Sequence, residues 1–230
     1  MAGTKSDYIP ALNRRWLTPL YDPLMRTVMR EEVFKRQLIE LASPQPGEQV
    51  LDLGCGTGTL TLMLQRAQPK AQVTGLDADQ MVLKIAHQKA EREQISTIRW
   101  DWGLADRLQY ADGAYDLVVS SMMIHHLTPE TKRRAFGEVF RVLKPGGRFH
   151  IADFGPPHDR LMRWVVVWMA HFEQTADNFK GQIPTYLSDA GFEQVVETRC
   201  LRSVFGPLSF YQALRSSPAQ TGQARLQGHG

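Results

Sequence analysis

Residues 49–60 read QVLDLGCGTGTL, and this stretch decides the fold. Its apolar first half, residues 50–53, predicts a short buried strand, and residues 59–67 predict a helix. The turn between them contains three glycines: Gly54, Gly56 and Gly58. A glycine-rich turn between strand and helix lets the backbone approach a ligand closely and aims the first N–H groups of the helix at it. Asp52 places a carboxylate beside this turn.

The glycine spacing separates two kinds of ligand. A dinucleotide fold requires G-x-G-x-x-G/A, whereas here glycines alternate and Thr59 follows. No Lys-Ser/Thr pair follows the glycines, which excludes a P-loop. A carboxylate at Asp52 favours a ligand with positive groups over a pyrophosphate. S-adenosylmethionine (SAM) carries an ammonium and a sulfonium and no phosphate, so it is the predicted ligand, with Cys55 and Thr57 also lining the turn.

The segment LDLGCGTGTL resembles the first motif of the class I SAM-dependent methyltransferases, especially the branch that includes the ubiquinone and menaquinone biosynthesis methyltransferases. The resemblance covers residues 47–153 well and extends weakly to both ends. It implies an α/β fold with a seven-stranded Rossmann-like sheet, helices on both faces and an antiparallel last strand. It also implies SAM as the methyl donor, S-adenosylhomocysteine as the product, and a small-molecule acceptor.

The same resemblance predicts an N-terminal helical lid and a helical insertion between strands five and six. The predicted boundaries are 1–43 for the lid, 44–215 for the SAM-binding domain, 154–182 for the insertion and 216–230 for a disordered tail. In the lid, Tyr8 and Tyr21 are predicted either to close the active site or to pack the lid helices onto the domain.

The second predicted strand covers residues 72–76, and Asp77 stands at its end, 23 positions after Gly54. An acidic residue at this place can accept hydrogen bonds from both ribose hydroxyls. The segment Gly75-Leu76-Asp77-Ala78-Asp79 resembles the second family motif. It therefore assigns Asp77 and Ala78 to the cofactor and Asp79 to the cap of helix 81–92. Met81 is predicted either to contact the adenosine or to belong to the core.

Residues 103–110 resemble a third family motif, GDA-x-x-LPF, but with one departure. The aspartate that reads the adenine amino group in the family falls on Leu104, which cannot accept that hydrogen bond. The backbone N–H of Ala105 can still donate to the adenine ring, and Leu104 can pack on it. Asp101 or Asp106 would have to supply any replacement carboxylate.

The fourth predicted strand, residues 115–120, leads into SSMMIHHL, and ligands of open α/β sheets bind at such carboxyl ends. Ser120 is predicted to contact the methionine part of SAM through its backbone. Met122 and Met123 face either the reaction centre or the following helix.

Two histidines of this segment are candidate bases. A histidine beside the methyl donor can remove a proton from an incoming nucleophile because its ordinary pKa lies near neutrality. His125 is the first candidate and His126 the second. The alternative is that one of them only bonds the backbone.

Residues 159–178 have helical periodicity with a broad apolar surface. The predicted acceptor-facing residues here are Trp164, Trp168, His171 and Phe172. A core helix and a homodimer face are equally good interpretations of the same pattern. Strands are then predicted at 192–201 and 208–214, the latter antiparallel.

Composition restricts the partners, metals and cell compartment that are expected for this chain. The chain has 230 residues, is 43% hydrophobic and 22% charged, and has a net charge of +3 with scattered basic residues, so no nucleic-acid partner is expected. The two cysteines, Cys55 and Cys200, show no disulfide or metal-ligand spacing, and no metal is expected. Their scarcity and the absence of an apolar signal core in residues 1–10 predict a cytoplasmic protein. The most apolar later run, 164–170, is far shorter than the ~20 residues of a membrane span.

The predicted activity is methyl transfer from SAM to a hydrophobic or aromatic small molecule by in-line displacement. Three alternatives stay open at this point. One is a SAM-binding scaffold or partner without catalysis, and another is a nicotinamide-dependent oxidoreductase, which the glycine spacing disfavours. The third is an RNA or protein methyltransferase, which would show a basic groove or an Asn/Asp-Pro-Pro-Tyr/Phe block where this chain has residues 120–123.

Overall fold

The computed structural model describes residues 31–169, 175–203 and 206–217. The predicted site residues Tyr8, Tyr21, His171 and Phe172 lie outside this part of the chain, as do most of the predicted lid and tail. The strands are β1 (Gln49–Leu53), β2 (Gln72–Asp77), β3 (Arg99–Trp102), β4 (Tyr115–Ser121), β5 (Leu143–Phe154), β6 (Glu193–Ser203) and β7 (Gly206–Leu214). The helices are α2 (Glu31–Ala42), α3 (Thr59–Ala67), α4 (Gln80–Arg92), α5 (Pro129–Val142), α6 (Arg160–Met169), α7 (Ala176–Phe179) and α8 (Ile183–Asp189), with a 3₁₀ turn η2 (Ile124–His126).

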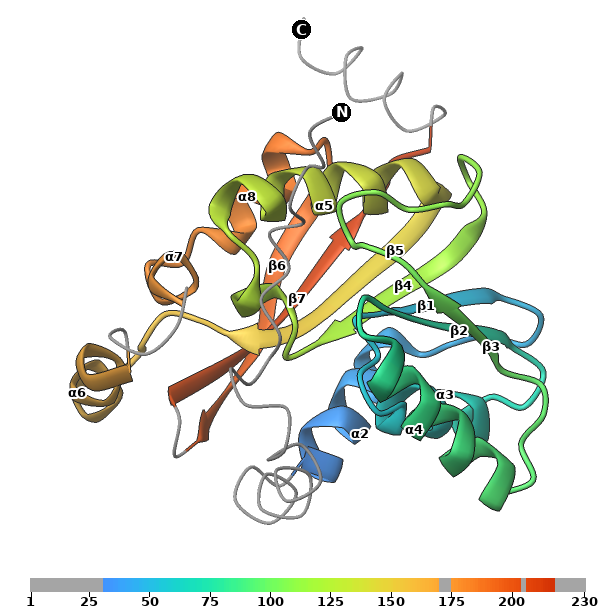
Figure 1. The fold of residues 1–230 in the computed structure, drawn as a ribbon. Helices are drawn as coiled ribbons and strands as arrows, with labels where there is room; N and C mark the ends of the chain where they lie inside the picture. The colour runs from blue at the N-terminus through green and yellow to red at the C-terminus, as the bar shows by residue number, and fades with distance from the viewer. Residues whose placement is uncertain (1–30, 170–174, 204–205, 218–230) are drawn as a thin grey trace, which may run out of the picture.

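All seven strands form one sheet in the order β3-β2-β1-β4-β5-β7-β6 (Figure 1). Strands β1 to β5 pair in parallel, and β7 is antiparallel to both β5 and β6. This arrangement confirms the predicted seven-stranded α/β sheet with an antiparallel last strand. The last strand does not lie at the edge, however, because β7 is inserted between β5 and β6.

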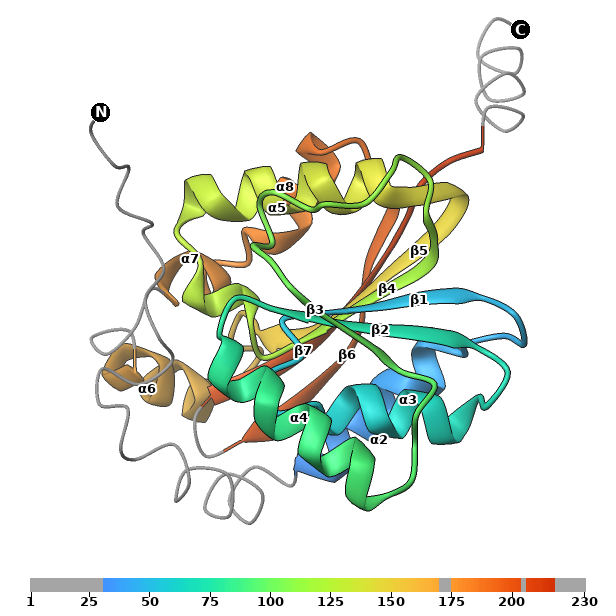
Figure 2. The ribbon, with the colours of Figure 1, turned by 45° about the vertical axis from the view of Figure 1, so that its right-hand side comes forward.

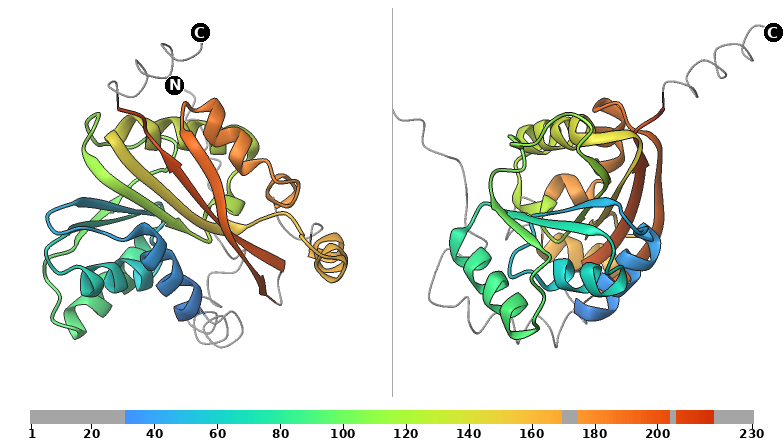
Figure 3. Two further views of the ribbon diagram at one scale, coloured as in Figure 1. Left: turned by 180° about the vertical axis from the view of Figure 1, so that it is seen from behind. Right: turned by 90° about the vertical axis from the view of Figure 1, so that its right-hand side faces the viewer.

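Helices cover both faces of the sheet, as predicted (Figures 1 and 2). Helices α5 and α8 pack on one face over a core that includes Phe149, Tyr211 and Leu187. Helices α2 and α3 pack on the other face over a core that includes Val50 and Phe210. In the view from behind in Figure 3, β6 and β7 (orange and red) diverge from β1 and β2 (blue and cyan).

Two predicted boundaries shift because strand pairing, not local composition, sets them. The sequence predicts a short strand around residues 97–100, but β3 begins two residues later, at Arg99, because Arg99 to Trp102 pair with the second half of β2. The sequence predicts a helix end at 143, a turn at 144–147 and a strand from Arg148, but β5 begins at Leu143 because Leu143 pairs with Tyr115 before the register shifts.

The order in which strands are added to the sheet changes side at β1. Strand β2 lies on one side of β1, and β4 lies on the other. The carboxyl ends of these strands meet at this point, which is where open α/β sheets bind their ligands. Both the glycine turn after β1 and the SSMMIHHL segment after β4 lie there. Helix α6 follows β5 beyond the same edge (Figure 1). None of the described helices combines the length and apolar character that crossing a membrane requires.

Candidate functional site

The glycine turn is fastened to the end of β2. The backbone N–H groups of Gly54 and Cys55 both donate to the carbonyl of Leu76, at 2.8 and 3.0 Å. All three glycines have left-handed backbones, with φ of 73° at Gly54, 53° at Gly56 and 77° at Gly58. Other residues adopt this conformation only with strain, so the repeated glycine is a requirement of the turn.

The turn is crowded on one side and open on another. A Cβ on Gly54 would lie 2.2 Å from Cγ of Met123, so the segment after β4 rests directly on the turn. A Cβ on Gly56 would meet no atom within 4 Å among the described residues. The backbone of Gly56 therefore faces space into which a ligand can approach.

Asp77 joins this turn to the start of α4. Its Oδ2 accepts from the backbone N–H of Gly56 at 2.8 Å, and its Oδ1 accepts from that of Asp79 at 2.9 Å. The Asp79 side chain accepts from the N–H of Met81 at 2.8 Å and thus caps α4, as predicted. Burial raises the pKa of Asp77 above its ordinary value. The structure thus places Asp77, the predicted acceptor for the ribose hydroxyls, at the open side of the glycine turn.

Asp52 lies deeper than the sequence suggested. Its side chain is fully buried, and its Oδ2 accepts from the hydroxyl of Thr61 at 2.6 Å. Its Oδ1 has no hydrogen-bond partner in the described part of the chain. Burial raises the pKa of Asp52 to about 6. A buried carboxylate with one unbonded oxygen thus lies beside the turn and does not contact solvent.

This shift of the Asp52 pKa has a testable consequence for stability. A carboxyl whose pKa is raised by folding costs free energy above that pKa, and the cost disappears as the pH falls towards the unfolded value. Asp52→Asn should therefore raise the melting temperature at about pH 7.5 by several degrees and by much less at about pH 4. Thermal unfolding of both proteins at the two pH values measures this, and an equal gain at both would contradict it.

The adenine end of the predicted site differs from the family motif as expected. Leu104 forms an isolated bridge with Arg107, whose N–H donates to the carbonyl of Leu104 at 3.2 Å. The two candidate replacement carboxylates have other partners. Asp101 accepts from the hydroxyl of Tyr110 at 2.9 Å, and Asp106 accepts from Arg134 at 2.9 Å. Each of these carboxylates is therefore held by a partner of its own, and no hydrogen bond among the described residues turns it towards Leu104.

Other predicted cofactor residues have clear structural partners. The hydroxyl of buried Ser120 donates to the carbonyl of Leu53 at 2.9 Å and ties β4 to β1 just before the turn. Thr57 accepts from Nζ of Lys89 at 2.7 Å. Trp102, which the sequence did not single out, donates from Nε1 to the carbonyl of Ala78 at 2.9 Å and fixes the corner after Asp77.

His125 is held by a carboxylate that the sequence analysis did not select. Its ring is buried in the turn η2, and its Nδ1 lies 2.9 Å from Oδ1 of Asp153 at the end of β5. Asp153 is fully buried and also accepts from the N–H groups of Ile124 at 2.8 Å and Phe154 at 2.7 Å. Burial alone would raise the pKa of Asp153, but His125 and these hydrogen bonds outweigh it, and the pKa is lowered. An ionised acceptor at Nδ1 fixes the ring orientation and the tautomer.

His126 has a different environment. Its ring lies 4.0 Å from that of His125, between ring centroids. Burial, and then the neighbouring His125, lower the pKa of His126 to about 3. The ring is therefore neutral at physiological pH and a weak proton acceptor. Of the two candidate bases, His125 is therefore the one whose ring is oriented by a buried carboxylate.

Two further side chains join this pair from distant parts of the chain. Nδ2 of Asn178 in α7 donates to Asp153 at 3.2 Å and to the carbonyl of Phe154 at 3.3 Å. Nζ of Lys132, whose side chain is fully buried, donates to Asp177 and Asn178, both at 2.6 Å. The position of Asp153 at a strand end could have been found from the sequence, whereas nothing in the sequence links Lys132 to residues 45 positions away.

The predicted apolar face of α6 points outwards. Leu161 is 62% exposed and Trp164 is 74% exposed, while Met162 is buried. The interpretation of this face as a core helix is therefore wrong for Leu161 and Trp164. Trp168 lies in the same helix. Nearer the turn, Met122 has a left-handed backbone (φ 53°) and its N–H donates to the carbonyl of Ala152 at 2.8 Å.

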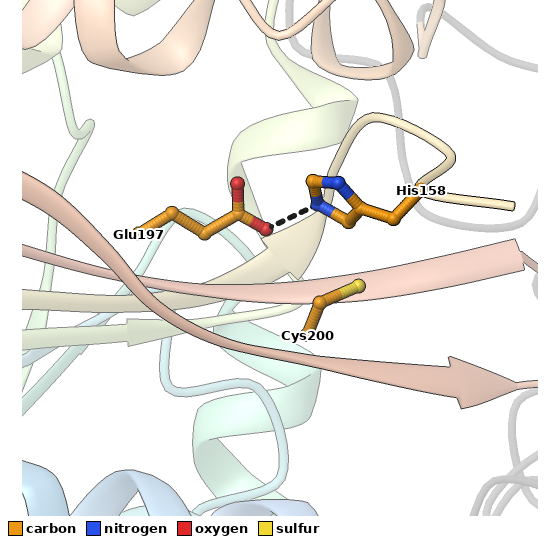
Figure 4. A group of neighbouring side chains, drawn as sticks. All are labelled: His158, Glu197 and Cys200. Carbon is orange, nitrogen blue, oxygen red and sulfur yellow. Dashed lines mark hydrogen bonds and ion pairs between the residues drawn. The ribbon is translucent and has the colours of Figure 1, made fainter.

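Away from the glycine turn, the fold assembles a cluster that the sequence spacing did not show. Ligand atoms of His158, Glu197 and Cys200 all lie within 4.8 Å of one another (Figure 4). Sequence spacing does not indicate this cluster, because Glu197 lies 39 positions after His158.

Comparisons with known proteins agree with this geometry. The profile of a family described as "Methyltransferase domain" matches residues 50–147. An uncharacterised methyltransferase of Synechocystis is 37% identical over 169 residues, which is 72% of this chain and 76% of that protein. The demethylmenaquinone methyltransferase of Thermus thermophilus is 36% identical over 61% of this chain and 64% of its own length. A ubiquinone/menaquinone biosynthesis C-methyltransferase of Shewanella piezotolerans is 30% identical over 76% of this chain and 79% of its own length.

Solved structures share the fold at lower sequence identity. The [4+2]-cyclase SpnF superposes with a TM-score of 0.65 at 21% identity, covering 80% of each chain. Phosphoethanolamine N-methyltransferase 2 of Haemonchus contortus, solved with S-adenosylhomocysteine and phosphomonomethylethanolamine, has a TM-score of 0.64 at 16% identity. That match covers 80% of this chain and 52% of the other.

The motif order, the sheet order and the curated relatives agree with one another and exclude the nicotinamide-dependent alternative. The chain belongs to the class I SAM-dependent methyltransferases, is similar to the ubiquinone and menaquinone biosynthesis enzymes, and uses SAM as its cofactor.

Proposed function

We propose that this enzyme transfers the methyl group of SAM to a small, apolar or aromatic acceptor whose nucleophilic atom loses a proton to His125. The observation that carries the proposal is the buried His125–Asp153 pair, 2.9 Å between Nδ1 and Oδ1. The pair lies at the carboxyl ends of β4 and β5, and Met123 of the same segment rests on the glycine turn. The base is thus next to the place where the cofactor is proposed to bind.

The residues present fit SAM. The open side of Gly56 leaves room for it, Asp77 offers a carboxylate to the ribose hydroxyls, and Leu104 with Ala105 supplies an apolar surface and an N–H for the adenine. Met81 is largely exposed at the start of α4, two residues after the Asp79 cap, and would pack on the adenosine. Ser120 would face the methionine part through its backbone, since its hydroxyl already bonds β1.

Bound SAM supplies a methyl group already activated by its sulfonium. The protein then has to align an acceptor atom opposite the leaving sulfur, and positioning of this kind can supply up to roughly 7–11 kcal/mol of a barrier. A base helps only when the acceptor is a poor nucleophile until deprotonated, as hydroxyls and carbon acids are. A buried histidine held by an ionised carboxylate therefore favours an oxygen or carbon acceptor over a thiolate.

The outward-facing apolar residues of α6 support an apolar acceptor. Leu161 and Trp164 lie on the helix that follows β5, beyond the edge of the sheet where the base lies. The names of the Thermus and Shewanella relatives make demethylmenaquinone-type compounds the first acceptors to try.

The test is a set of acceptors incubated with methyl-labelled SAM, after calorimetry has established that S-adenosylhomocysteine binds. Label should enter a demethylated quinone-type acceptor and should not enter its already methylated counterpart, which is the matched control. Phosphoethanolamine serves as a small polar acceptor. Transfer to phosphoethanolamine and not to the apolar acceptors would overturn the proposed acceptor class.

A further inference from the structure

We infer that His158, Glu197 and Cys200 form a binding site for a divalent cation of the zinc class, separate from the methyl-transfer site. Figure 4 shows the three side chains converging from the loop after β5 and from β6. Nε2 of His158 lies 2.9 Å from Oε1 of Glu197, and all three ligand atoms fall within 4.8 Å of one another. Ligand atoms around a tetrahedral zinc ion lie about 3–4 Å apart, so small side-chain rotations complete the geometry.

A β-bulge puts two of the ligands on one face of the sheet. Residues three apart on a regular strand point to opposite faces. Here Glu197 pairs with Tyr211 and Cys200 pairs with Ser209, and the register shifts between Glu197 and Arg199. Tyr211 and Ser209 are two apart on β7 and share a face, so Glu197 and Cys200 share it as well. Bulges that redirect a side chain are common beside functional sites.

The third ligand is held over the same strand by its neighbour in sequence. Asp159 accepts from Nε of Arg202 in β6 at 2.9 Å and from the N–H of Met162 at 2.9 Å. These bonds fix the start of α6 against β6 and keep His158 above Glu197. The site is thus assembled by backbone geometry and a second ion pair.

The donor set favours zinc over the alkaline-earth cations. One thiol sulfur, one imidazole nitrogen and one carboxylate oxygen suit a borderline-soft ion, whereas Mg²⁺ and Ca²⁺ prefer oxygen ligands alone. Three protein ligands leave one position for water. Coordination displaces the proton of the Cys200 thiol, so binding should strengthen as the pH rises.

A cation here would connect the chain just after β5 with the edge strand β6. His158 is five residues after Asp153, the partner of the proposed base. The proposed cation site therefore includes the segment that leads from the methyl-transfer site into α6. Its occupancy should change the stability of this segment and need not change the chemistry of methyl transfer.

The test uses Co²⁺, because a cobalt–thiolate bond gives a charge-transfer absorption that nitrogen and oxygen ligands do not give. The reduced full-length protein should show this absorption on titration with Co²⁺. Cys200→Ser should abolish it, and His158→Gln and Glu197→Gln should each weaken binding by roughly tenfold or more. Zn²⁺ should displace the cobalt and raise the melting temperature of the wild type but not of Cys200→Ser.

Two variants provide matched controls. His87→Gln removes an exposed histidine that also pairs with a glutamate, Glu91, at 3.2 Å but has no cysteine beside it in the described structure. Cys55→Ala removes the other cysteine, which is buried. Both should retain the cobalt–thiolate absorption of the wild type. Absence of the absorption in the wild type, its persistence in Cys200→Ser, or equal weakening by His87→Gln would each overturn the proposal.

Discussion

Replacing His125 by glutamine is expected to lower kcat for methyl transfer by about 10²–10³-fold, because general base catalysis contributes an effect of this order. The affinity for S-adenosylhomocysteine should change by less than about threefold, since the substitution removes a group that acts on the acceptor and not on the cofactor. Single-turnover transfer of labelled methyl, with calorimetric titration of S-adenosylhomocysteine on the same samples, measures both quantities.

The neighbouring histidine is the control for this result. His126→Gln should leave kcat within a few-fold, because a ring whose pKa is about 3 accepts a proton poorly at neutral pH. Asp153→Asn should lower kcat and shift its pH profile while KM stays nearly constant, since Asp153 orients His125 without touching the acceptor. A His125→Gln enzyme that is folded and less than about fivefold slower would exclude the histidine as the base.

Replacing Asp77 by alanine is expected to weaken S-adenosylhomocysteine binding by about 100-fold or more. A carboxylate that accepts from two ribose hydroxyls contributes hydrogen bonds of about 1.5–3 kcal/mol each, and their loss corresponds to this factor. The substitution also removes the acceptor of the Gly56 N–H and so loosens the turn. Calorimetry at constant pH and salt measures the change.

The control is Asp79→Ala, two residues further along. Asp79 caps α4 through its side chain, whereas its backbone N–H, which the variant keeps, is what bonds Asp77. The variant should lose about 1 kcal/mol of stability through the lost cap and retain its affinity within a few-fold. If Asp79→Ala weakened binding as much as Asp77→Ala, the two aspartates would not have the separate roles proposed for them.

Most of the fold could be predicted from the sequence because the strand–turn–helix units around the glycine turn are local. Helix α3 has the predicted bounds and strand β1 begins one residue earlier than predicted, since three left-handed glycines separate the two elements. The place of β7 between β5 and β6 could not be predicted, because it depends on pairings between residues far apart. The start of β3 shifted for the same reason.

The candidate site was predicted less completely. Asp77 and His125 could be selected because each follows a strand in a motif, and the structure brings both to one edge of the sheet. Their assignment to the cofactor and the acceptor stays a prediction. Asp153 was missed although its place at a strand end is a sequence signal, whereas Asn178 and the His158 cluster were missed because sequence spacing does not reveal contacts between elements 20 to 50 residues apart.

The bonds from Lys132 to Asp177 and Asn178 also determine which part of this enzyme can be exchanged for that of a relative. They join α5 to α7, and Asn178 in turn bonds Asp153. A chimaera that replaces the whole of 154–182 would keep Asp153 beside the proposed base but remove Asp177 and Asn178, and with them the bonds that tie Asp153 to α7 and α5. A graft confined to residues 160–174 keeps these bonds and both partners of the His158–Glu197 contact. Under the function proposed above, grafts or libraries that vary acceptor preference are therefore best confined to that shorter segment.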